Sequence, residues 1–188
     1  MSLLIGMDEA GYGPNLGPLV ITASVWEIPD EPVDFDIWAA LSDVVSQEPI
    51  KEPKDPEDIV RKVQVGDSKD VYSPAKGIAE LEKSVQTILG LLECDPYNFR
   101  ELVGFLSPDI EIEEEPWFHE KDLELPLSKT KSELIDEIIE KWKKLSDKTG
   151  VRLKQIRSEI VLTRRYNELL EEHASKGVML SRTSLGLL

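Results

Sequence analysis

This chain has almost no cysteine or histidine and no long hydrophobic run: it contains one Cys and two His among 188 residues. The lone Cys94 excludes an internal disulfide, which fits a reducing compartment and predicts a cytoplasmic protein. The longest apolar stretch, residues 18–26, is shorter than the roughly 20 residues that cross a bilayer, so no membrane-spanning segment is predicted. The N-terminus also lacks the basic and apolar regions of a secretory signal.

Positive charge is scarce as well. The chain has 22 Lys and Arg but 37 Asp and Glu, which gives a net charge of −15. Such a protein lacks the overall field that draws nucleic-acid phosphates. Carboxylates that hold divalent ions invert the local charge, however. A nucleic-acid partner is therefore compatible with this composition only at a local metal site, and the acidity elsewhere is interpreted as a source of solubility.

The apolar pattern predicts an α/β protein with one domain, residues 1–188, because a chain of this length buries one sizeable core. Residues 95–128 show no strong period, and we interpret them as an irregular acidic insertion. The first two strands, joined by a glycine-rich loop, are expected to pair antiparallel. The predicted strands are residues 3–7 (buried), 19–28 and 151–156, and the predicted helices are 35–45, 74–92 with Ser73 as N-cap, 132–146, 159–174 and one starting at Ser181.

Two adjacent carboxylates, Asp8 and Glu9, follow the first apolar run and precede a glycine-rich turn. Successive side chains of a strand leave on opposite faces, so both can serve one site only if the backbone departs from strand geometry just after them. Gly11, Gly13 and Pro14 predict that departure. Adjacent Asp and Glu are also common as a solvated surface pair, but this context predicts a metal site.

The motif Asp8-Glu9-Ala10-Gly11-Tyr12-Gly13-Pro14 is followed by Gly17-Pro18-Leu19-Val20 and later by Asp67-Ser68-Lys69 ahead of a helix. In this combination the chain resembles the type 2 ribonucleases H, the ribonucleases HII and HIII. The resemblance implies an RNase H-like α/β fold, in which helices flank a mixed central sheet, and hydrolysis of the RNA strand of RNA–DNA hybrids. It also implies two divalent ions, Mg²⁺ or Mn²⁺, with Asp8 and Glu9 as catalytic metal ligands. Two such ions activate water and stabilise the leaving oxygen at phosphorus.

The resemblance further implies which residues contact the substrate. Gly11, Tyr12 and Gly13 form a turn against the nucleic acid, and Ser68 and Lys69 lie near the scissile phosphates. Tyr12 stands where the bacterial family has Arg, and a phenol does not give the bidentate, charged contact of a guanidinium.

Two further carboxylates of the family lie beyond the position that matches Leu188, so we expect this chain to be the N-terminal part of the fold. Asp67 is interpreted as structural rather than metal-binding. Two other functions stay open: a non-catalytic binding or interaction module, and a nuclease for another nucleic acid such as DNA. The sequence does not indicate the oligomeric state.

One group of basic residues supports either of two interpretations. Its members could contact a phosphate backbone, but nearby glutamates favour ion pairs along a helix equally well. The group comprises Arg152, Lys154, Arg157, Arg164 and Arg165.

Overall fold

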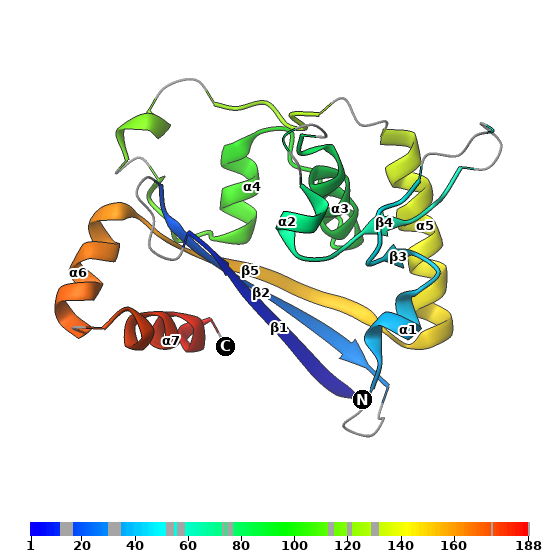
Figure 1. Cartoon of the computed structure of the whole chain (residues 1–188), viewed down its shortest axis with the longest axis horizontal. Helices are drawn as coiled ribbons and strands as arrows, with labels where there is room; N and C mark the ends of the chain where they lie inside the picture. The colour runs from blue at the N-terminus through cyan, green and yellow to red at the C-terminus, as the bar shows by residue number, and fades with distance from the viewer. Residues whose placement is uncertain are drawn as a thin grey trace. The chain divides into compact units, whose positions relative to one another are not determined.

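The structure of the chain is a computed structural model and is mixed α/β, with a mainly antiparallel three-stranded sheet flanked by helices (Figure 1). The described residues form two compact units. One unit comprises Met1–Leu3, Trp26–Tyr97 and Glu124–Leu153, and the other comprises Leu4–Val25, Asn98–Leu123 and Lys154–Leu188. Residues 12–16, 30–34, 52–54, 56–58, 73, 75–76, 113–114, 120–121, 129–131, 174 and 188 lie outside the description.

The three-stranded sheet has the order β1-β2-β5. Its strands are β1 (Ser2–Ala10), β2 (Leu19–Ile28) and β5 (Arg152–Val161). Gly6 lies opposite Ser24, and Gly11 lies opposite Pro18, which is the register of an antiparallel pair. The predicted bounds of the second strand and its predicted antiparallel partner are thus confirmed.

The predicted burial of the first strand is wrong. Leu3, Leu4, Ile5 and Met7 are 66%, 37%, 44% and 40% exposed. The physical reason is the position of β1, which pairs with β2 on one side and is an edge strand of the described sheet. An apolar run in sequence does not distinguish a central strand, buried on both faces, from an edge strand.

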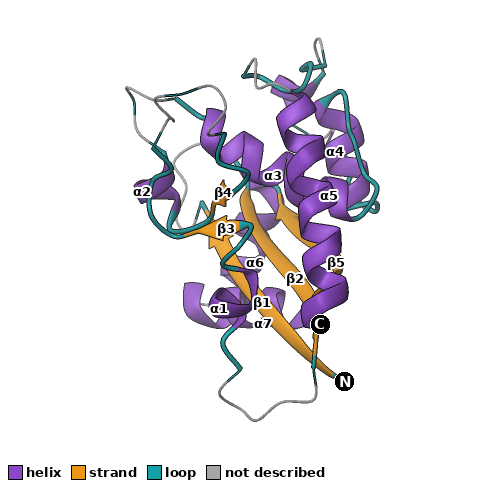
Figure 2. Cartoon of the chain, turned by 90° about the vertical axis from the view of Figure 1, so that its right-hand side faces the viewer, coloured by secondary structure: helices purple, strands orange, loops and turns teal. Residues whose placement is uncertain are grey.

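The first unit contains a helix pair and a short two-stranded parallel sheet. Helix α3 packs against α5 so closely that a Cβ on Gly90 would lie 2.3 Å from Ile139 Cδ1 (Figure 2). Trp26 and Trp142 stack in the core of this unit, with ring centroids 6.3 Å apart. The elements are α1 (Ile37–Leu41), β3 (Val45–Ser46), β4 (Val63–Gln64), α2 (Ser68–Val71), α3 (Ala79–Leu91) and α5 (Ser132–Thr149).

The second unit has its own core, which gathers around the sheet residues Leu19, Ile21 and Val161 and the helix residues Tyr166 and Met179. A hydrogen bond of 2.9 Å between the hydroxyls of Thr22 and Ser158 links β2 to β5. The helical elements of this unit are α4 (Phe99–Leu106), a single 3-10 turn η2 (Pro116–Phe118), α6 (Thr163–His173) and α7 (Lys176–Gly186).

Several predicted helix boundaries are corrected by the backbone. The helix expected from Pro74 begins at Ala79, because Gly77 has a φ of 67° that a right-handed helix excludes. Its predicted N-cap, Ser73, lies outside the described residues. Within 95–128, expected to be irregular, α4 was not predicted, although the Asn98 side chain caps it by accepting from the Glu101 N–H at 2.8 Å.

Boundaries near the C-terminus also shift. Strand β5 continues to Val161, so α6 begins at Thr163 instead of residue 159. Ser181 lies inside α7 and not at its start, since that helix begins at Lys176. In the described part of the chain, no helix is both long and apolar enough to cross a membrane.

Candidate functional site

Asp8 and Glu9 lie near the end of β1, and both are exposed. The backbone N–H of Glu9 donates a hydrogen bond of 2.9 Å to Asp8 Oδ1, which holds that carboxylate against the strand. The pleat of a strand directs consecutive side chains to opposite faces. Each carboxylate is therefore accessible from its own side of β1.

The predicted bend begins at Gly11, directly after β1 ends. Gly11 has a φ of 83°, and a Cβ at this position would lie 2.6 Å from the carbonyl oxygen of Pro18. Both the left-handed backbone and the close approach require glycine. Tyr12 and Gly13, which the sequence also assigns to the substrate-contacting turn, lie outside the described residues.

Because β1 continues as a regular strand through Ala10, its pleat does not bring the two carboxylates together. In the described sheet β1 pairs with β2 alone, so the other edge offers backbone groups and space beside Asp8 and Glu9. No described group of three or more His, Cys, Asp or Glu side chains is arranged to hold a metal ion.

Ser68 and Lys69, the other predicted substrate contacts, begin the short helix α2 in the first unit, whereas Asp8, Glu9 and Gly11 belong to the second. Ser68 and Lys69 are therefore described separately from Asp8, Glu9 and Gly11. Asp67 caps α2, because its Oδ1 accepts from the Lys69 N–H at 2.9 Å. This contact agrees with the structural role expected for Asp67.

Two members of the basic group form intramolecular ion pairs. Arg152 donates to Asp147 Oδ1 at 2.7 Å. Arg165 lies 3.4 Å from Glu168 and 3.1 Å from Glu172, and its hydrogen bond to Glu172 is the main cause that raises the pKa of Arg165. For these two arginines the structure favours the ion-pair interpretation.

Glu115 belongs to the segment that the sequence predicts to be an irregular acidic insertion, and its side chain is buried. Its Oε1 accepts a hydrogen bond of 2.8 Å from the backbone N–H of Thr163, the first residue of α6. A carboxylate at a helix N-terminus satisfies an unpaired N–H and complements the helix dipole. The partners are 48 residues apart in sequence, so no local pattern marks the contact.

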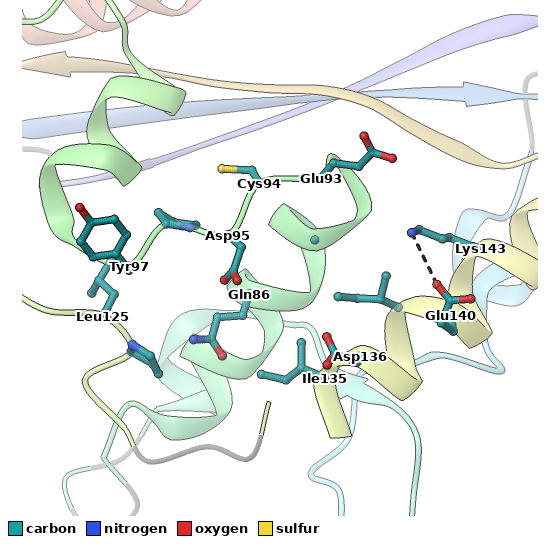
Figure 3. Close-up of a pocket in the computed structure, with 14 residues that line it drawn as sticks. Gln86, Glu93, Cys94, Asp95, Tyr97, Leu125, Ile135, Asp136, Glu140 and Lys143 are labelled. Atoms are coloured by element: carbon teal, nitrogen blue, oxygen red, sulfur yellow. Dashed lines mark ion pairs between the residues drawn. The ribbon is translucent and has the colours of Figure 1, made fainter. Parts of the chain in front are cut away.

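The first unit also contains a cavity of about 680 Å³ that the sequence did not indicate. Gln86, Asp95, Tyr97 and Asp136 are among its lining residues (Figure 3). They come from α3, from the segment after it and from α5, and only their packing brings them together.

Comparisons with known proteins give no relative on which an assignment could rest. No protein-family model matches the chain, and neither the curated proteins nor the solved structures include a match.

Proposed function

We propose that this chain is a metal-dependent nuclease that hydrolyses phosphodiester bonds. In this proposal it cuts the RNA strand of RNA–DNA hybrids, as a type 2 ribonuclease H does. The observation that carries the proposal is the end of β1. There, two exposed carboxylates precede Ala10 and Gly11, and only glycine permits the backbone conformation of Gly11.

The donor chemistry of Asp8 and Glu9 fits a hard cation. Oxygen ligands suit Mg²⁺ and Mn²⁺, and Mg²⁺ is commonly bound by one or two carboxylates together with substrate phosphates. Such an ion, when bound, activates water and stabilises the leaving oxygen of the displacement. Asp8 and Glu9 would hold the ion and offset its charge.

Gly11 has a separate role in this proposal. Without a side chain, its backbone permits close approach by a ribose or phosphate group. The close approach of Gly11 to the Pro18 carbonyl oxygen holds the end of β1 beside the start of β2. Ser68 and Lys69 are proposed as further substrate contacts, with Lys69 as a point positive charge for a phosphate.

The decisive experiment is cleavage of an end-labelled RNA–DNA hybrid in Mg²⁺ by the wild type, Asp8→Asn and Glu9→Gln. Loss of a metal ligand removes several kcal/mol of transition-state stabilisation, so each variant should cleave at least about 100-fold more slowly. Glu171→Gln, an exposed position on α6, is the matched control for one lost negative charge. Unchanged cleavage by Asp8→Asn would refute the assignment.

A non-catalytic module is the second candidate, and one observation favours it. No third metal-ligating side chain joins Asp8 and Glu9 within the described residues. Calorimetric titration with Mg²⁺ separates the two functions. Heat of binding that Asp8→Asn abolishes supports the nuclease, whereas no binding at millimolar Mg²⁺ supports the module. Duplex DNA and DNA with a single ribonucleotide, assayed in parallel, test the alternative substrates.

A further inference from the structure

Strand β1 presents an accessible apolar surface at one edge of the described sheet. Every residue from Leu3 to Ala10 is exposed, and consecutive residues lie on opposite faces, so both faces of the strand are open. Four of these residues are large, apolar and 37% to 66% exposed: Leu3, Leu4, Ile5 and Met7. In the described sheet β1 pairs with β2 alone, so its other edge offers backbone N–H and C=O groups to a further strand.

Over residues 2–7, β1 lacks the features that keep a second strand away from an edge. Such features include Lys and Pro side chains and a segment that covers the strand. Residues 2–7 contain no Lys, Arg or Pro, and from Leu3 onward they are exposed. The two charged side chains of β1, Asp8 and Glu9, lie near its end. The apolar part of the strand is therefore open to pairing.

The apolar pattern of β1 is self-complementary. When two identical strands pair antiparallel about a two-fold axis, residues opposite each other lie on the same face of the sheet, so the axis passes through one residue. With the axis at Ile5, that side chain faces its own copy. Leu3 then faces Met7 of the second copy, and Leu4 faces Gly6. Each exposed apolar side chain thus lies opposite an apolar residue or glycine, and such a match sets the register of strands.

The position of the charges favours this register over its neighbours. An axis at Gly6 would place Leu4 opposite Asp8, and an axis at Leu4 would pair fewer residues of β1. With the axis at Ile5, Asp8 lies opposite Ser2 of the second copy and about 20 Å from its Asp8, at roughly 3.3 Å per residue. This separation exceeds two Debye lengths at physiological salt, so the repulsion between the two carboxylates is small.

From these observations we infer that two copies of the chain pair through β1, antiparallel about a two-fold axis at Ile5, and join their sheets into one. The second copy is the occupant because its own β1 supplies matching apolar residues at the matching positions. One strand edge offers less surface than the roughly 800 Å² per partner of a standard stable interface, and each copy has a net charge of −15. The dimer is therefore weak, with a Kd on the order of 100 µM, and salt strengthens it by screening the repulsion.

Disulfide trapping tests the register. In a Cys94→Ser background, which removes the single native thiol, Ile5→Cys places two thiols on the axis, where Cβ atoms of facing residues are about 4.5–5.5 Å apart. Met7→Cys is the matched control, because the two native side chains are 44% and 40% exposed on the same strand. Its thiols would lie about 13 Å apart in this register.

The variants are oxidised mildly at a chain concentration near the Kd and separated on a non-reducing gel. Ile5→Cys should give at least about fivefold more covalent dimer than Met7→Cys, because only its thiols reach bonding distance. An equimolar mixture of Leu3→Cys and Met7→Cys should give the mixed dimer, since these two residues face each other across the axis.

Sedimentation equilibrium of the wild type measures the dimer without any substitution. From micromolar to millimolar chain the average mass should rise from monomer toward dimer, and the Kd should be at least about threefold lower in high salt than in low salt. A dimer held by ion pairs would show the opposite dependence on salt.

Three results would overturn the inference. They are a monomeric wild type at millimolar concentration in high salt, equal trapping of Ile5→Cys and Met7→Cys, and a Kd that rises with salt. Hybrid cleavage is assayed at nanomolar chain, where the protein is monomeric, so none of these results bears on the nuclease proposal.

Discussion

Replacement of Gly11 by Ala tests whether the turn after β1 is fixed by a close backbone contact. The new Cβ would lie 2.6 Å from the Pro18 carbonyl oxygen, well inside normal contact distance. That oxygen belongs to the backbone, and the next residue, Leu19, is 0% exposed in the core of the second unit. The carbonyl therefore cannot move away without disturbing buried packing.

Gly17→Ala is the matched control, because it has the backbone cost without the clash. Gly17 has a φ of 86°, close to the 83° of Gly11, but no atom lies within 4 Å of its added Cβ. We expect Gly17→Ala to lower the free energy of unfolding by about 1 kcal/mol, the net cost of a left-handed alanine. For Gly11→Ala the overpacking adds about 1–3 kcal/mol, so the total is about 2–4 kcal/mol.

Urea denaturation followed by far-UV circular dichroism measures both variants. Gly11→Ala should show the lower midpoint at an unchanged slope, and thermal scans should place its Tm roughly 5–15 °C below that of the wild type. Equal destabilisation by the two variants would refute the reasoning, since it would show that the contact with Pro18 contributes nothing beyond the backbone conformation.

Three further predictions concern residues of the second unit. Glu115→Ala removes the acceptor at the start of α6 and should lower the free energy of unfolding by about 1–2 kcal/mol in urea denaturation. Glu115→Gln keeps an acceptor, so its free energy of unfolding should fall by less than half of that amount. Equal losses by the two variants would show that the acceptor is unimportant. The exposed apolar edge strand β1 is expected to promote self-association at high concentration, and Ile5→Lys, at a position 44% exposed, should reduce it in analytical ultracentrifugation; a monomeric wild type, or association unchanged in the variant, would contradict this role of β1. Glu172→Gln removes one exposed partner of Arg165 and should change stability by less than about 1 kcal/mol, with a smaller effect in high salt; a loss above about 2 kcal/mol would contradict a surface role for this pair.

Where structure depends on residues near in sequence, the sequence predicted it. The bounds of β2 agree with prediction, and the predicted helix from residue 132 ends before Gly150, whose φ is 74°. Asp67 was expected to be structural and caps α2. Alternating or helical periodicity, glycine stops and caps act within a few residues, so they can be recognised without knowledge of the fold.

For the candidate site, the sequence alone selected Asp8 and Glu9 and the glycine that bends the chain after them. Their role with a metal ion stays a prediction. Side-chain chemistry identifies candidate ligands, but a complete coordination shell also needs ligands from residues distant in sequence.

Tertiary structure alone decided which surfaces each segment meets. It made β1 an edge strand with exposed apolar residues, buried Glu115 at the start of a helix 48 residues away, and brought Gln86, Asp95 and Asp136 together around one cavity. Burial and the pairing of charges depend on contacts between distant segments, and the composition of a short stretch is compatible with several such contacts. Local sequence therefore specified the elements of this protein, while long-range packing specified what those elements expose.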